Sequence, residues 1–171
     1  STPLNHFYLN WDIVENDQVE KLAFMDVKDG KIYYLNQHDN EILKKLNLNK
    51  SNIENNGGIK SYFEFNKTKY AYVAFQNDYC AKASIFDLSS GIEVVSFPCL
   101  PEYGNHDLNS TGGAFISLDE NKFLLSVGTP NSSGSKKIQD LAQNPNSPYG
   151  KFLLFEMNKE NKLDFTVFSL G

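Results

Sequence analysis

The strongest constraint on the fold is a repeated pattern of short apolar runs separated by polar turns. Each run is too short for a core helix and is rich in the aromatic and β-branched residues that favour strands. The runs form two sets of four, at residues 59–65, 70–76, 81–88 and 92–97, then 113–118, 122–127, 151–157 and 163–168. Gly57-Gly58 opens the first set and Gly112-Gly113 the second. This repetition predicts two four-stranded antiparallel meanders.

A less regular set of runs at residues 19–48 predicts a third unit of the same kind. The sequence therefore predicts one all-β domain, residues 1–171, of propeller-type antiparallel blades at about 19–48, 57–98 and 112–169. Residues 41–48 also fit a helical turn, because their apolar positions match a 3.6-residue period. Residues 1–15 fit either a first strand or an edge segment.

The connections of a meander alternate between the two ends of its sheet. The short turns at residues 66–69 and 119–121 are therefore expected at one end, and the connections at 77–80, 98–111 and 129–149 at the other. The last connection is rich in Ser, Asn and Pro and is unusually long for a compact domain. Long polar loops on a rigid scaffold are typical of binding sites, so we expect function at this end.

The two cysteines, Cys80 and Cys99, flank a hairpin whose expected turn is Ser89-Ser90. Counting outward from this turn places the cysteines directly opposite each other, close enough for a disulfide. Two alternatives stay open: both thiols are free and buried, or a bulge near Pro98 shifts the register by one residue. A disulfide would indicate an oxidising compartment, and hence a secreted or periplasmic protein.

Composition narrows the range of partners. With 171 residues, 40% of them hydrophobic, the chain can bury a core. The net charge is −5 and the basic residues are scattered, which argues against nucleic acid or an anionic membrane surface as a partner. No apolar run approaches the ~20 residues of a membrane helix, so no membrane span is expected.

The long connections hold few titratable side chains that suit catalysis. His106 and Asp107 are neighbours, and a histidine beside a carboxylate can act as a general base. An ordinary surface histidine is the simpler alternative. No histidine has companions at metal-ligand spacing, so no metal site is predicted.

Polar residues of the longest connection form a second group of candidates. Lys136, Asp140 and Gln143 fall on an expected helical turn at residues 135–142. They suit a polar ligand or calcium, although their spacing matches no calcium-binding motif. A solvated loop without a ligand is the alternative.

Five short motifs in the second half of the chain follow one another in a distinctive order. They are Gly112-Gly113, Asp119-Glu120-Asn121-Lys122, Ser126-Val127-Gly128, Ala142-Gln143-Asn144 and Tyr149-Gly150-Lys151. Their order and spacing resemble those of PQQ-dependent sugar dehydrogenases, a group that includes soluble glucose dehydrogenase, aldose sugar dehydrogenase and the glucose/sorbosone dehydrogenase domain. The resemblance implies a six-bladed β-propeller, of which this chain would be the N-terminal half.

The sequence departs from the family's pattern at the active site. Aligning on the Gly-Gly pair puts Ser110 where the family carries the histidine that abstracts the sugar hydroxyl proton during hydride transfer to PQQ. Serine cannot act as that base at neutral pH without a partner of its own. Thr129 and Asn144 stand where the family has aspartate, and Leu154 stands where the family has arginine. No catalytic residue is therefore assigned, and the ligand-binding candidates are Thr129, Lys136, Asp140, Gln143 and Asn144.

These departures favour a non-catalytic or degenerate relative that serves as a binding or interaction module, with carbohydrate as the ligand that the resemblance suggests. No cofactor is then expected for this chain alone. One alternative is the N-terminal part of an active oxidoreductase that uses PQQ and calcium, and another is a structural assembly module. Three blades leave two open flanks, so we expect self-association or a missing C-terminal half.

Overall fold

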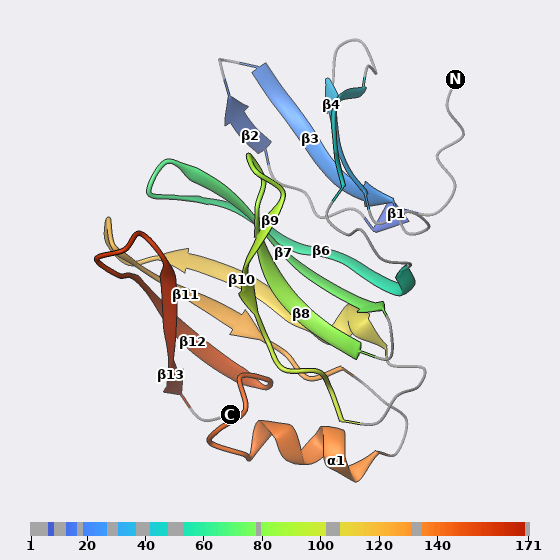
Figure 1. Cartoon of the computed structure of the whole chain (residues 1–171), viewed down its shortest axis with the longest axis vertical. Helices are drawn as coiled ribbons and strands as arrows, with labels where there is room; N and C mark the ends of the chain where they lie inside the picture. Colours follow the sequence, from blue (N-terminus) through green and yellow to red (C-terminus); the bar gives the residue numbers. More distant parts are fainter. Residues whose placement is uncertain are drawn as a thin grey trace.

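The computed structural model describes residues 7–8, 13–16, 19–26, 31–36, 42–47, 53–77, 80–101, 107–130 and 135–169. Side chains are described at residues 57–76, 80–101, 107–130 and 135–168. This part of the chain is mostly β, and its strands form three antiparallel sheets (Figure 1). No helix among the described residues is long and apolar enough to cross a membrane.

The first sheet contains β1 (Phe7–Tyr8), β2 (Ile13–Asn16), β3 (Val19–Asp26), β4 (Lys31–Asn36) and β5 (Ile42–Asn47). Its strand order is β1-β3-β4-β5, and β2 also pairs with β3. Of the two structures that the apolar pattern allowed for residues 41–48, the strand is the one formed. Part of residues 1–15 also forms strands, as β1 and the start of β2.

The other two sheets are four-stranded meanders, as the repeated runs predicted. The middle sheet contains β6 (Ile53–Phe65), β7 (Thr68–Asn77), β8 (Cys80–Asp87) and β9 (Ile92–Ser96). The last sheet contains β10 (Gly112–Ser117), β11 (Lys122–Val127), β12 (Lys151–Met157) and β13 (Leu163–Ser169). In both sheets the spatial order follows the chain.

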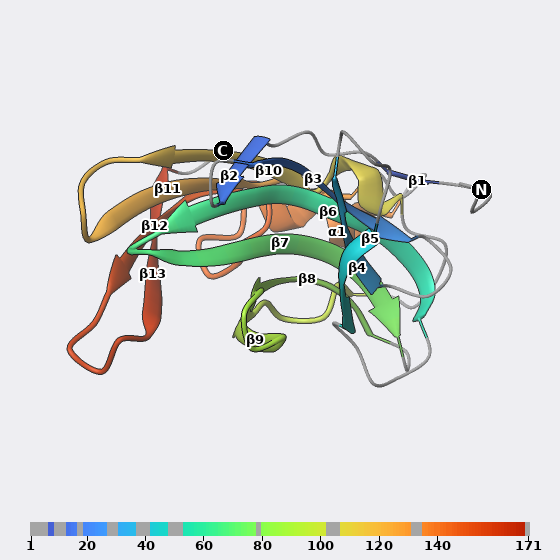
Figure 2. The same cartoon turned by 90° about the horizontal axis from the view of Figure 1, so that it is seen from above.

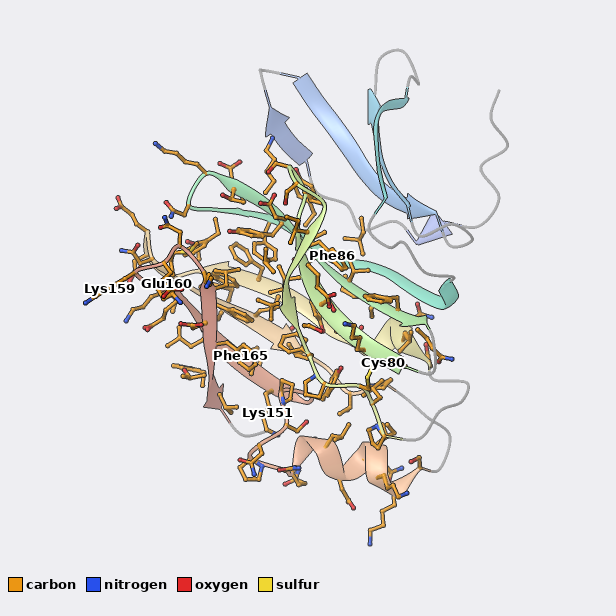
Figure 3. All side chains as sticks on the ribbon, viewed as in Figure 1. Cys80, Phe86, Lys151, Lys159, Glu160 and Phe165 are labelled. Atoms are coloured by element: carbon orange, nitrogen blue, oxygen red, sulfur yellow. A yellow bond between two sulfur atoms is a disulfide. The ribbon has the colours of Figure 1, made fainter. Side chains whose placement is uncertain are left out.

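Short turns join neighbouring strands at one end of these two sheets. Asn66 and Lys67 have φ values of 48° and 61°, which suit a tight hairpin turn with both central residues left-handed. In the β10–β11 turn the Asp119 carboxylate accepts from the Asn121 N–H at 2.7 Å. Lys159 and Glu160, in the β12–β13 turn, lie at this end, whereas Lys151 lies at the opposite end (Figure 3).

The β8–β9 hairpin differs from its expected form in two ways. Its loop spans residues 88–91, since the Gly91 N–H donates to the Asp87 carbonyl at 2.8 Å, so it is wider than the expected Ser89-Ser90 turn. The register then shifts at a bulge, because Phe86 pairs with Glu93 but Ile85 pairs with Val95. The bulge lies at residues 93–95, a few residues before the position near Pro98 that the sequence left open.

The middle and last sheets pack face to face through aromatic side chains. Between the sheets, the Phe63 ring of β6 stacks on the Phe115 ring of β10 at 4.4 Å. Within the last sheet, the Phe123 ring stacks on the Phe155 ring at 4.7 Å. Phe65 meets Phe123 edge-on at 4.7 Å, so the rings of both sheets form one cluster.

Glycine residues let the first strands of the two sheets approach closely. A Cβ added to Gly113 on β10 would lie 2.4 Å from the Lys60 carbonyl oxygen on β6, where no side chain fits. A Cβ on Gly57 would likewise lie 2.5 Å from the Leu108 Cβ. The first strands β6 and β10 lie at one edge of the stack and the last strands β9 and β13 at the other (Figure 2).

The middle sheet is buried on its second face as well. Ile59, Tyr62, Val73, Phe75 and Phe86 belong to a separate apolar cluster there. The strands β1 and β3 of the first sheet contact β6. By contrast, the last sheet exposes large apolar side chains on its outer face, among them Ile116, Phe152 and Phe168.

Candidate ligand-binding site

The long connections meet at the end of the stack opposite the short turns. The Tyr149 hydroxyl, from the β11–β12 connection, donates to the Pro98 carbonyl at 2.7 Å and accepts from the Ala83 N–H at 3.2 Å. These contacts join the longest connection of the last sheet to β8 and to the segment after β9. The described parts of residues 98–111 and 129–149 therefore share one end, as the meander predicted.

The β9–β10 connection is fixed to the middle sheet just before Gly112-Gly113. A short 3₁₀ helix, η1 (Leu108–Ser110), places Leu108 against β6, where it is buried. Thr111 is also buried, and its carbonyl accepts from the Tyr72 hydroxyl at 2.7 Å. Burial raises the pKa of Tyr72, and the neighbouring Tyr149 adds to the shift, so the hydroxyl stays protonated.

The β11–β12 connection contains the helical turn that the sequence predicted at residues 135–142. It consists of α1 (Lys136–Gln139) and the 3₁₀ helix η2 (Asp140–Ala142), with Ser135 capping the Ile138 N–H. The buried Lys151 ammonium donates to the Ala142 carbonyl at the C-terminal end of this segment. The helical segment at residues 135–142 is thus held by specific contacts at both of its ends.

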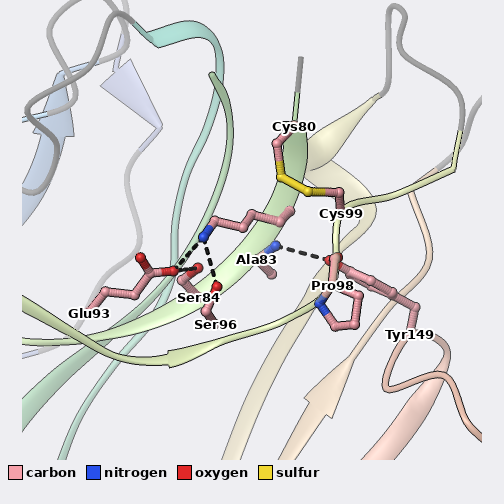
Figure 4. The surroundings of a disulfide bond; sticks show 9 residues. Cys80, Ala83, Ser84, Glu93, Ser96, Pro98, Cys99 and Tyr149 are labelled. Carbon is pink, nitrogen blue, oxygen red and sulfur yellow. Dashed lines mark hydrogen bonds and ion pairs between the residues drawn. A yellow bond between two sulfur atoms is a disulfide. The ribbon is translucent and has the colours of Figure 1, made fainter. Parts of the chain in front are cut away.

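The two cysteines form a disulfide, with a Cα–Cα distance of 5.2 Å (Figure 4). It joins Cys80, at the start of β8, to Cys99, just beyond β9. Cys99 is exposed. The bond forms although the β9 bulge shifts the register, because the chain leaves the regular ladder near Pro98.

Two of the residues singled out by the resemblance lie close together. The Gly128 N–H donates to the Thr111 carbonyl at 2.8 Å. Ser110 precedes Thr111 and Thr129 follows Gly128, so this hydrogen bond brings Ser110 and Thr129 close together. Ser110 is exposed and Thr129 is half-buried. The Thr129 side chain also lies near Gly150.

The remaining candidates do not gather around Ser110. Asp107 is exposed, but its carboxylate accepts from the Asn109 N–H at 3.0 Å and so caps η1. Lys136, Asp140, Gln143 and Asn144 are exposed on the helical segment and the turn after it. The Asn144 side-chain oxygen accepts from the Asn146 N–H at 2.9 Å, a contact that shapes this turn. His106 lies outside the described residues.

Lys60 is a candidate that the sequence did not reveal. It lies on β6, and its ammonium is 3.5 Å from the Asn109 side-chain oxygen on η1. Partial burial lowers the pKa of Lys60, and the nearby Asp107 carboxylate opposes this shift. A lysine in a strand pattern looks like an ordinary surface residue, and only the Gly113–Lys60 approach places it beside the loop.

The arrangement presents groups that can bind a polar ligand. Lys60, Asp107 and Asn109 present an ammonium, a carboxylate and an amide at one edge, which can donate to and accept from hydroxyl groups. No described side chain forms a hydrogen bond with the Ser110 hydroxyl that would activate it as a base or nucleophile. Among the described residues, no group of three or more His, Cys, Asp or Glu side chains could hold a metal ion.

Comparison with protein-family models gave no match for this chain, and comparison with curated proteins gave none either.

Proposed function

We propose that this chain is a non-catalytic binding module whose long connections take a polyhydroxyl ligand, with carbohydrate as the ligand class. One observation carries the proposal: the Lys60 ammonium on β6 lies 3.5 Å from the Asn109 side-chain oxygen on η1, with the Asp107 carboxylate nearby. Sugars are bound through such sets of charged and amide side chains because each hydroxyl both donates and accepts. Ser110 in the base position of the resembled family supports a binding role over an oxidoreductase role.

The scaffold in this proposal is a set of propeller-type blades, as in PQQ-dependent sugar dehydrogenases. Three features support it. The middle and last sheets are both four-stranded meanders with a Gly-Gly pair in the first strand. Their first strands approach closely at Gly113, and at the other edge the Phe97 ring, just after β9, meets the Phe165 ring of β13 edge-on at 5.4 Å. Sheets that converge at one edge and diverge at the other suit wedges around a common axis.

The binding proposal is tested by titrating isotope-labelled protein with monosaccharides and short oligosaccharides, and by a glycan array. Lys60→Met and Asn109→Ala are expected to weaken binding about tenfold, the loss of about one charged hydrogen bond. Lys162→Met is the matched control, since Lys162 is exposed and ion-paired to Glu160 in the turn at the opposite end. Absence of any saccharide binding to the unmodified chain would refute the carbohydrate ligand.

The oxidoreductase alternative is tested separately with PQQ and calcium. The proposal expects neither bound-cofactor absorbance nor sugar-dependent dye reduction. Turnover by this chain would overturn the non-catalytic role.

The Cys80–Cys99 disulfide supports a secreted or periplasmic location, because disulfides persist in oxidising compartments. Thiol alkylation of protein taken directly from its source organism tests this location. Full protection of both cysteines is expected, and ready labelling would contradict it.

A second candidate function, assembly with another copy of the chain, is favoured by the outer face of the last sheet. Ile116, Phe152 and Phe168 are exposed there by 59%, 50% and 60%. The same sheet carries the ion pair between Lys122 and Glu156, so a two-fold contact could exchange these partners between copies. Solution scattering would show a dimer, and Phe152→Ser would abolish it. A compact monomer would rule this function out.

A further inference from the structure

The disulfide lies where the β8–β9 ladder opens. The N–H groups of Phe97 and Leu100 donate to β8 carbonyls at 3.1 and 2.7 Å. Between them, Pro98 has no N–H to offer. Cys99 follows Pro98 directly and is bonded to Cys80 on β8. The disulfide therefore holds the Pro98 segment against β8 at a point where the backbone ladder is interrupted.

The same segment holds the longest connection. The Pro98 carbonyl accepts from the Tyr149 hydroxyl, which also accepts from the Ala83 N–H. Tyr149 is buried, with 2% of its surface exposed. Two residues later, Lys151 binds the carbonyls of Leu141 and Ala142 at the end of η2. A continuous set of contacts thus leads from the disulfide to the helical segment.

We propose that the Cys80–Cys99 disulfide is a redox-sensitive restraint on the β11–β12 connection. With the bond intact, the Pro98 carbonyl is fixed and Tyr149 anchors the connection. With the bond broken, the Pro98 segment still donates to β8 from Phe97 and Leu100 but has lost its covalent restraint, so the hydrogen bond from Tyr149 to the Pro98 carbonyl is weakened. The helical segment at residues 136–142 then becomes more mobile while the sheets stay folded.

The reductant is a dithiol. One thiolate attacks a protein sulfur to give a mixed disulfide and release the other cysteine as a thiolate. The second thiol of the reductant then displaces the remaining cysteine and closes its own disulfide. Two electrons pass to the protein, which gains two protons and becomes a pair of thiols. Cys99 is exposed and Cys80 half-buried, so the disulfide lies at the surface of the protein.

Hydrogen exchange with the oxidised and reduced chain tests the restraint. The probes are the amides of Gln143, Asn144 and Ser147, which donate to backbone carbonyls within the connection. Reduction should speed their exchange about tenfold, the effect of losing one to two buried hydrogen bonds. The reference amides are those of Leu125 and Leu153 in the β11–β12 ladder, which should keep their rates. Unchanged probes, or equal acceleration of the reference amides, would overturn the proposal.

Two variants check the route through Tyr149. Replacing both cysteines, Cys80→Ser with Cys99→Ser, should give the fast exchange without any reductant. Tyr149→Phe should give fast exchange in the oxidised chain, and reduction should then add less than about twofold. If reduction accelerates Tyr149→Phe as much as the unmodified chain, the route through Tyr149 is wrong.

A loss of saccharide affinity on reduction is also expected, and this consequence alone rests on the proposed function. If the probe amides exchange faster on reduction but saccharide affinity is unchanged, the disulfide still restrains the connection, and the helical segment is not part of the binding site.

Discussion

Replacing Tyr149 by phenylalanine should cost the fold about 2 kcal/mol, far more than a typical Tyr→Phe change at the surface. The hydroxyl bridges two backbone groups, the Ala83 N–H and the Pro98 carbonyl. Ala83 is fully buried, so its N–H has no access to water once the hydroxyl is gone. An orphaned buried donor costs roughly 1–3 kcal/mol. Pro98 is exposed, so water can replace the hydroxyl at its carbonyl and little is added there.

The measurement is urea unfolding with the disulfide intact, together with thermal unfolding. For a chain of this size, about 2 kcal/mol corresponds to a drop in Tm of roughly 4–8 °C. The matched control is Tyr70→Phe, since Tyr70 is also a buried tyrosine of the apolar cluster, and its hydroxyl is bonded to the half-exposed Thr68 side chain. The control should lose less than about 1 kcal/mol. Equal losses in the two variants would refute the claim that the Ala83 N–H depends on Tyr149.

Three further predictions concern stability. Stability should fall as pH rises above ~10, because tyrosines ionise there in the unfolded chain, while burial keeps the pKa of Tyr149 and Tyr72 higher in the folded chain. The free energy of unfolding of Tyr149→Phe should therefore fall less steeply with pH in this range. An identical slope in the variant and the unmodified chain would contradict this. Gly113→Ala should destabilise the fold by at least ~2 kcal/mol in chemical unfolding, since the added Cβ would clash with β6 and the backbone φ at residue 113 is 120°. A neutral effect would show that β6 and β10 can separate. Phe123→Ala should cost about 3–5 kcal/mol, because Phe123 is fully buried and contacts rings of both sheets; a loss below ~1 kcal/mol would mean that the sheets stack weakly.

The strands were predictable because their signals are local. Alternating apolar residues and turn residues placed β11 and β12 at the observed bounds and most other strands within a few residues. The exception is β6, which begins at Ile53 instead of residue 59. Residues 54–58 are polar or glycine, and they join the sheet only because β7 is long enough to pair with them through several register shifts.

The candidate site was only partly predictable because its contacts are distant in sequence. Tyr149 and Ala83 are 66 residues apart, and Lys60 and Asn109 are 49 apart. No local pattern marks a lysine or a tyrosine for such contacts. They arise from the stacking of two sheets, which depends on the glycine contact at Gly113 and on the aromatic cluster. Asp107 was noticed for its charge, but its role as the cap of η1 became visible only from the backbone.

The two edges of the stack should affect the binding site independently. At the edge with β6 and β10, the Gly113 contact sets the distance between Lys60 and Asn109, the side chains proposed to bind the ligand. At the β8–β9 edge, the disulfide and Tyr149 set the mobility of the longest connection. Residues this far apart with no shared partners usually contribute additively. Gly113→Ala should therefore weaken ligand binding equally in oxidised and reduced protein, whereas a redox-dependent effect would show that the two edges are coupled through the aromatic cluster.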